Sequence, residues 1–347
     1  MIEYTNYILI TIVTLFIILS LKFLSKYFEI FNEASSNTIR KIHTEKVIKV
    51  GGLCFLSLLI IFFYIDDLLL KKLILFSYIL MFIGLIADIN KKFSSYTRLI
   101  LTALIIFLLI YSENFYIDDI SYKYINEIFI DYPYTAYIFS LLCLIVCING
   151  FNFIDGNNGL LLGTTLIILI NFLTYIDTDN TDLILIIYSL FIASSILFLF
   201  NIISGKILTG DNGAYFIGSL IGVIAIYIKS FDILDSFQIA CILFYPATEV
   251  AFSSTRRIFV LGKNPFYPDN LHLHSNLFKI LTKDIPRDNF KKINLFNSAT
   301  SILIIILQIF LSIFIFFSSI YLSFFQILIF LILTYALIYI LLYKYIH

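Results

Sequence analysis

The sequence predicts an all-α fold, a polytopic integral membrane protein with about 11 transmembrane helices, and three observations support this prediction. Of the 347 residues, 61% are hydrophobic and only 13% are charged, whereas soluble domains carry about 25% charged residues. The mean hydropathy is +0.99. Apolar runs of about 20 residues, enough to cross a bilayer, follow one another along the chain. A water-soluble enzyme is excluded, and a net charge of zero gives no reason to expect nucleic acid as a partner.

The apolar runs define the spans in chain order. The first is kept as a membrane helix because it is too long for the core of a signal peptide and no small-residue cleavage site follows it. Each later run is bounded by charged residues or by a glycine-containing break. The predicted spans lie near residues 7–27, 50–65, 71–87, 97–115, 134–153, 159–176, 183–201, 213–228, 237–255, 296–319 and 322–343. Little chain remains between them, so residues 1–347 form a single transmembrane domain.

The basic residues decide the orientation of these spans. Eleven crossings place the termini on opposite sides, and cytoplasmic loops carry an excess of Lys and Arg. With the N-terminus outside, only Lys71, Lys72, Lys123 and Lys229 of the 23 basic residues lie outside. We therefore predict an outside N-terminus and a cytoplasmic C-terminus. The cytoplasmic loops then lie near residues 28–49, 88–97, 154–158, 202–212 and 256–295.

Polar residues suited to chemistry gather in these loops, and ionisable groups at membrane-helix ends indicate a functional site. The segment NGFNFIDGNNGL, residues 149–160, combines acid and amide side chains with glycines that permit close approach to a ligand. Asn149, Asn152, Asp155 and Asn158 recur every three residues. We expect them to line one side of a helix corner.

Two further segments favour a metal ion and a phosphate. GKILTGDNGAYFIG places Asp211 at a predicted helix start, where free backbone N–H groups favour an anion and the carboxylate can hold a divalent cation. DNLHLHS presents His272 and His274, with Arg256 and Arg257 in the same basic loop. Imidazolium and guanidinium groups suit phosphate, whereas His-x-His alone is a weak zinc signal. Oxygen ligands without thiolates predict Mg²⁺, with Mn²⁺ as a substitute, and a phosphorylated substrate.

In this order, the motifs NGFNFIDGNNGL, LTGDNGAYFIG and HLH resemble those of the polyprenyl-phosphate N-acetylhexosamine-1-phosphate transferases. The similarity extends to RKIHTEKVIKVGG, GLIADINKKFSSYTRL and YPATEVAFSSTRR, and so covers about residues 40–280. The forms FNFIDGNNGL, GDNGAYFIG and DNLHLH look closest to the branch that primes O-antigen synthesis.

The resemblance implies an enzyme of the bacterial inner membrane with its active site facing the cytoplasm. Such an enzyme transfers a sugar 1-phosphate from a UDP-N-acetylhexosamine to undecaprenyl phosphate and releases UMP. This reaction is the first membrane step of O-antigen or other cell-surface glycan synthesis. Mg²⁺ is the implied cofactor, and a homodimer is compatible with the sequence.

The resemblance also implies roles for individual residues. Asn152 and Asp211 match Mg²⁺ ligands, Asn158 matches a residue near the uridine, and the histidine pair matches basic residues that meet the diphosphate. The predicted catalytic residues are Asp88, Asp155, His272 and His274. The predicted substrate-binding residues are Asn149, Asn158, Arg40, His43, Arg256 and Arg257. Arg40 and His43 would reach the lipid phosphate or serve only to set the topology.

One position departs from the family pattern, which has two adjacent acids after the third span where this chain has Ala87 and Asp88. A phosphate monoester, with a second pKa of about 6, is mostly ionised at pH 7 and can attack directly. We therefore favour a single displacement in which Asp88 orients the acceptor phosphate or the metal shell. Covalent catalysis by Asp88 and a catalytically impaired relative stay open. A polytopic transporter is a further alternative, although transporter sites lie near the bilayer midplane.

Overall fold

The structure is a computed structural model that describes residues 2–28, 32–33, 47–90, 92–176, 180–260, 262, 271–286 and 289–346. It confirms an all-α, multi-pass membrane protein. Within the described residues, eight helices are long and apolar enough to cross a membrane. They are α1 (Ile2–Leu24), α2 (Leu68–Ile89), α3 (Ser95–Glu113), α5 (Tyr134–Ile154), α7 (Thr181–Ser204), α8 (Gly210–Ser230), α12 (Phe290–Ser318) and α13 (Phe324–Ile346).

The other three predicted spans contain shorter helices. The second is η2 (Gly51–Phe63), a 3₁₀ helix, which rises about 2.0 Å per residue and so extends further than an α-helix of equal length. The sixth is α6 (Leu160–Tyr175). The ninth is divided into α9 (Ser236–Ile242) and α10 (Phe244–Thr255), because Pro246 lacks an N–H and is tolerated only in the first turn of a helix. The number of crossings and the orientation of the termini stay predictions.

Two short helices lie in segments that are predicted from the sequence to be loops. These are α4 (Lys123–Asp131), between α3 and α5, and α11 (Leu273–Leu281), after α10. The predicted loop 256–295 also contains the π-helix η3 (Arg256–Val260) and the first turn of α12. Both α4 and α11 are amphipathic, so an analysis of long apolar runs does not detect them.

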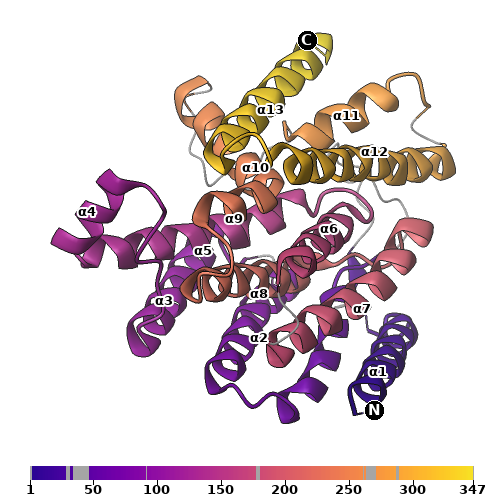
Figure 1. Cartoon of the computed structure of the whole chain (residues 1–347). Coiled ribbons are helices and arrows are strands. Elements are labelled where there is room, and N and C mark those ends of the chain that lie inside the picture. Colours follow the sequence, from indigo (N-terminus) through magenta and orange to yellow (C-terminus); the bar gives the residue numbers. More distant parts are fainter. Residues whose placement is uncertain are drawn as a thin grey trace.

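Helix α8 lies at the centre of the bundle (Figure 1). Every residue from Asn212 to Lys229 is buried, and α8 packs against α2, α5 and η2. Glycine makes two of these crossings close. A Cβ atom on Gly84 would lie 2.4 Å from the backbone oxygen of Asp211, and one on Gly218 would lie 2.9 Å from the Cα atom of Ile148. The α2 and α5 helices therefore both reach the N-terminal half of α8.

A short backbone pairing joins the start of η2 to the start of α8. Strand β1 (Asn32–Glu33) pairs antiparallel with β2 (Val47–Ile48). The Ile48 N–H donates to the Lys206 oxygen at 2.9 Å, and the Leu208 N–H donates to the Ile48 oxygen at 2.7 Å. Lys49 is thereby placed beside the first residues of α8. The opposite end of the bundle carries ion pairs such as Lys72 with Glu113, whose atoms are 2.6 Å apart.

Candidate active site

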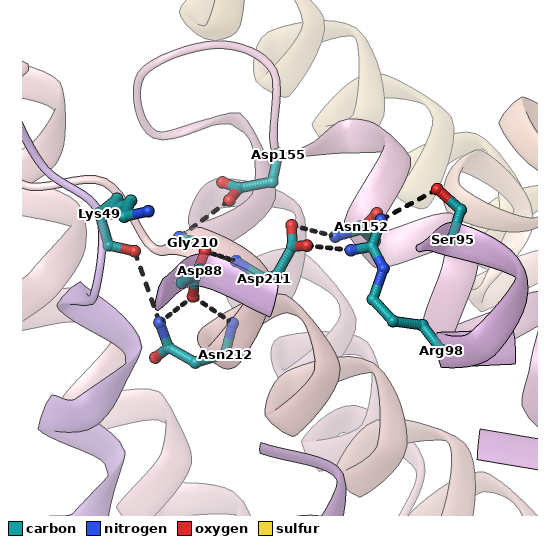
Figure 2. A network of polar contacts seen from close by, with 9 residues as sticks. All are labelled: Lys49, Asp88, Ser95, Arg98, Asn152, Asp155, Gly210, Asp211 and Asn212. Atoms are coloured by element: carbon teal, nitrogen blue, oxygen red, sulfur yellow. Dashed lines mark hydrogen bonds and ion pairs between the residues drawn. The ribbon is translucent and has the colours of Figure 1, made fainter. Parts of the chain in front are cut away.

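Two carboxylates from other parts of the chain hold the first turn of α8 (Figure 2). Asp88, near the end of α2, accepts hydrogen bonds from the N–H groups of Asp211 at 3.1 Å and Asn212 at 2.9 Å, and from Asn212 Nδ2 at 2.6 Å. Asp155, just after α5, accepts from the Gly210 N–H at 3.1 Å. Helix N-termini attract such anions. The expectation that these three N–H groups are free for a substrate anion is wrong, because Asp88 and Asp155 accept hydrogen bonds from them.

The carboxylate of Asp211 faces α3 and α5 (Figure 2). Arg98 forms an ion pair with Asp211 Oδ2 and also donates to Ser95 Oγ at 3.1 Å. Asn152 Nδ2 donates to Asp211 Oδ1 at 2.9 Å. The Arg98 and Asp211 side chains are 19% and 32% exposed, so a ligand can reach them. The two predicted metal-binding residues, Asn152 and Asp211, are therefore in direct contact.

Arg98 is a site residue that its sequence motif does not single out, because a basic residue in a cytoplasmic loop is accounted for by the topology. It lies in the first turn of α3, where the helix dipole disfavours a cation. A basic residue in that position needs a nearby acid, and this signal could have identified it.

Gly210 permits the close packing around the α8 N-terminus. Its φ is +75°, a left-handed conformation that favours glycine. A Cβ atom there would lie 1.8 Å from the Lys49 backbone oxygen. The same oxygen accepts from Asn212 Nδ2 at 3.4 Å. Any side chain at position 210 would push Lys49 and the start of α8 apart.

The acids around this turn bear on the predicted Mg²⁺ site. Burial, together with the charges of Asp211 and Asp88, raises the pKa of Asp155 well above its usual value, and a divalent cation would relieve this repulsion. Among the residues that the structure describes, no three His, Cys, Asp or Glu side chains form a group that could hold a metal. Mg²⁺ commonly takes one or two carboxylates and completes its shell with water and substrate phosphates. Asp211 and Asn152 fit such a partly open site.

The predicted histidine pair packs against the turn between α5 and α6. His272 Nδ1 lies 3.1 Å from Glu249 Oε2, and the His272 ring lies 5.2 Å from the Phe153 ring. The rings of His272 and His274 are parallel, with centroids 5.4 Å apart. A Cβ atom on Gly156 would lie 2.3 Å from His274 Nε2. The pair is therefore close to the segment that carries Asn152 and Asp155.

His274 differs from the sequence-based expectation of two cationic imidazoles. It is only 3% exposed, and burial lowers its pKa to about 4. The ring is thus neutral at pH 7 and does not contribute a positive charge. Its role as a catalytic residue stays a prediction.

The two predicted arginines have different surroundings. Arg257 is buried, and its guanidinium carbon lies 5.6 Å from the centre of the Phe153 ring, so it lies on the site side of α5. Arg256 lies over the Tyr339 ring of α13 and donates to the Leu271 oxygen at 3.0 Å. This contact holds the residue that precedes His272. Arg40 and His43 lie outside the described residues.

The four residues spaced by three do not line one side of a corner. Asn152 and Asp155 face the start of α8, but Asn158 is fully buried. The Asn158 N–H donates to Asn297 Oδ1 at 2.8 Å in α12, and Asn149 Nδ2 donates to the Ile145 oxygen at 2.8 Å within α5. The three-residue spacing fails because α5 ends at Ile154 and the chain then turns. Substrate-binding roles for Asn149 and Asn158 stay predictions.

Comparison with known proteins identifies the part of the chain that builds this site. Residues 70–229, from α2 to α8, match the family model described as glycosyl transferase family 4. Over this segment the chain is similar to glycosyl transferase family 4. This match includes Asp88, Arg98, Asn152, Asp155 and Asp211, whereas the histidine pair lies beyond it.

Curated relatives of this chain carry names from two groups of enzymes. A Bacillus subtilis protein named "Probable undecaprenyl-phosphate N-acetylglucosaminyl 1-phosphate transferase" is 31% identical over 49% of this chain and 48% of its own length. A Thermotoga maritima protein named "Undecaprenyl-phosphate alpha-N-acetylglucosaminyl 1-phosphate transferase" is 28% identical over 40% of this chain and 41% of its own length. A "Phospho-N-acetylmuramoyl-pentapeptide-transferase" of Borrelia duttonii is 23% identical over 41% of this chain and 45% of its own length. The chain spans about half the length of these relatives, whose names do not single out an O-antigen branch.

Proposed function

We propose that this protein transfers a sugar 1-phosphate from a UDP-N-acetylhexosamine to undecaprenyl phosphate, giving a lipid-linked diphosphate sugar and UMP. The observation that carries the proposal is the convergence of Asp88, Arg98, Asn152, Asp155 and Asp211 at one end of the membrane helices. The names of the relatives supply the acceptor and the kind of group transferred.

We further propose where this reaction belongs. The enzyme would lie in the bacterial inner membrane with its site facing the cytoplasm, since most Lys and Arg residues fall in loops at that end. Its product would prime O-antigen or another cell-surface glycan. An acceptor with an isoprenoid tail stays in the bilayer, which accounts for a phosphotransfer site built at the ends of membrane helices.

The chemistry requires charge neutralisation, because a phosphate must approach a diphosphate. An oxygen of the lipid phosphate would form a bond to the sugar-linked phosphorus, and the bond from that phosphorus to UMP would break. Arg98, His272 and Arg257 are the side chains that would bind the anions and hold them in line. Asp211 and Asn152 would hold Mg²⁺, or Mn²⁺ in its place, and the bound ion would neutralise charge on the diphosphate.

The contacts of Asp88 support a single displacement. Both of its oxygens accept hydrogen bonds from the first turn of α8, and its side chain is 8% exposed. We therefore assign it the task of holding Asp211 in place rather than attacking phosphorus. The lipid phosphate is already mostly ionised at pH 7, so the absence of an acid at Ala87 does not prevent attack.

Release of UMP by purified protein tests the proposal. The protein would be placed in liposomes with undecaprenyl phosphate and Mg²⁺, and offered UDP-GlcNAc, UDP-GalNAc and 6-deoxy analogues. We expect release with at least one donor, a fall of roughly a hundredfold or more in Asp211→Asn, and no change in Asp118→Asn, which lies outside the site. No release with any donor, or equal release by Asp211→Asn, would contradict the proposal. Donor uptake into the liposomes without UMP release would instead support a transporter.

A further inference from the structure

Glu249 in α10 is a buried acid with a specific contact to each oxygen. Its side chain is 1% exposed. Its Oε2 lies 3.1 Å from His272 Nδ1, and its Oε1 accepts from the Leu273 N–H at 3.2 Å. A carboxylate withdrawn from water in this way is stable only when it is paired and hydrogen-bonded. The contact of Oε2 joins Glu249 to a predicted catalytic histidine.

We propose that Glu249 is a positioning residue that fixes the orientation and the tautomer of His272. The inference rests on the proposed function, in which His272 meets the donor diphosphate. An acceptor at Nδ1 keeps a proton on that nitrogen. Nε2, the nitrogen opposite, is then left for the substrate. It acts as an acceptor when the ring is neutral and as a donor when the ring is charged.

Two aromatic neighbours pack against the His272 ring and restrict its rotation. Nδ1 therefore stays at Glu249, and Nε2 is the nitrogen left for the substrate. Phe153, adjacent to the proposed metal ligand Asn152, packs against the His272 ring at 5.2 Å, and His274 stacks on it at 5.4 Å. The charged or titratable neighbours of the pair are His274 in α11, Tyr245 in α10, Tyr335 in α13 and Arg257 in η3. Of these, His274 is neutral at pH 7 because of its burial.

A purely structural role for Glu249 would use only its other oxygen. The side chain of His272, the N-cap residue of α11, does not cap that helix. Glu249 Oε1 of α10 caps it instead by accepting a hydrogen bond from the Leu273 N–H. Such a cap predicts a loss of stability on substitution but no effect on the His272 tautomer. The tautomer therefore separates the two roles.

Nitrogen NMR measures the tautomer directly. The chain has four histidines, so ¹⁵N-histidine labelling gives few signals, and the loss of signals in His272→Gln assigns that ring. We expect the Nδ1-protonated form in the parent and in Glu249→Gln, which keeps an acceptor. Glu249→Leu, which keeps volume but no acceptor, should lose this form. Glu113→Gln, which breaks the ion pair with Lys72 outside the site, is the matched control and should leave the signals unchanged.

Kinetics give the second readout. We expect kcat for UMP release to fall by roughly ten- to a hundredfold in Glu249→Leu, as when a partner orienting a functional histidine is lost, and by less in Glu249→Gln. KM for the UDP-sugar should change little. Adding His272→Gln to Glu249→Leu should cost little more, because the two residues act as a unit.

The two readouts separate this inference from the proposed function. A His272 ring protonated at Nε2 but not at Nδ1 in the parent would overturn the positioning role even if Glu249→Leu failed to fold. An unchanged tautomer and kcat in a folded Glu249→Leu would do the same. If the NMR result is as expected but the parent releases no UMP from any donor, the proposed function fails and the positioning of His272 stands.

Discussion

Asp88 and Asp155 accept hydrogen bonds from consecutive N–H groups at the start of α8, while Asp211, carried by those same residues, faces Arg98 and Asn152. Two acids thus orient a third. Asp88 is also the acid that this chain retains where the resemblance leads one to expect an adjacent pair, and its three hydrogen bonds give a physical reason for its presence.

Replacing Asp88 tests whether it orients or attacks. Asp88→Ala loses all three hydrogen bonds, so we expect UMP release to fall by roughly ten- to a hundredfold and to remain measurable, because the nucleophile belongs to the lipid. Asp118→Ala is the control. UMP exchange into the UDP-sugar without acceptor should be absent. Such exchange in the parent, with its loss in Asp88→Ala, would show a covalent intermediate on Asp88.

The neutral His274 predicts a loss of stability in acid. Burial lowers the folded-state pKa to about 4, from 6.5. Between pH 6.5 and pH 4 the unfolded chain therefore binds a proton at His274 that the folded protein does not bind. The free energy of unfolding falls as the pH drops through this window. The expected loss from this residue between pH 7 and pH 5 is about 2 kcal/mol. Thermal unfolding in detergent, followed by circular dichroism, should show a smaller loss for His274→Gln. Equal losses would contradict a buried neutral ring.

At the scale of helices, the sequence predicts the long spans well because the thickness of the bilayer fixes their length. Helices α2, α5 and α8 were expected from their apolar runs alone. The break between α9 and α10 was missed, because Pro246 interrupts an apolar run without adding charge. Helices α4 and α11 were missed because they are short and amphipathic.

The sequence predicts those site residues whose side-chain chemistry and position at the ends of predicted helices mark them as functional. Asp211, Asn152 and Asp155 are brought together as their motifs suggested. The contacts of Arg98 and Glu249 are not predictable in this way, because their partners are not neighbours in sequence. Asp211 is 113 positions from Arg98, and His272 is 23 positions from Glu249. The packing of α3 and α8 on α5 brings Arg98 to Asp211, and the packing of α10 and α11 on α13 brings Glu249 to His272.

Two glycines provide a matched test of how α8 is seated. Gly210 and Gly262 both have positive φ, at +75° and +58°. A Cβ atom on Gly210 would meet the Lys49 oxygen at 1.8 Å, whereas one on Gly262 would meet nothing within 4 Å among the described atoms. Gly262→Ala should therefore cost only about 1 kcal/mol of backbone strain. Gly210→Ala should lower the melting temperature further and reduce UMP release by roughly tenfold or more. Similar effects of both substitutions would contradict the close approach of Lys49 to α8.

At the scale of the whole molecule, large apolar side chains are exposed on the helices, as expected of surfaces that face lipid, and polar groups gather at the helix ends. The turns after α2 and α5 and the start of α8 lie at the site end, while the segment between α3 and α5 lies at the other. The distribution of Lys and Arg predicts that the site end faces the cytoplasm.

Cysteine labelling in intact cells tests this orientation. Lys92 and Asp118 are exposed at opposite ends of the bundle, and three of the four native cysteines are buried. A membrane-impermeant maleimide should label Asp118→Cys from outside, and Lys92→Cys only after the membrane is opened. Labelling of Lys92→Cys from outside would place the site on the wrong side for a cytoplasmic UDP-sugar.

The fate of the sugar-linked phosphate distinguishes transfer of a sugar 1-phosphate from transfer of the sugar alone. UDP-N-acetylhexosamine carrying ³²P in its β-phosphate would be incubated with the protein, undecaprenyl phosphate and Mg²⁺, and the lipid would be extracted. Transfer of a sugar 1-phosphate predicts that the label enters the lipid fraction in step with the release of unlabelled UMP. Label that stays in water as UDP while sugar reaches the lipid would show cleavage at the sugar carbon and contradict the account.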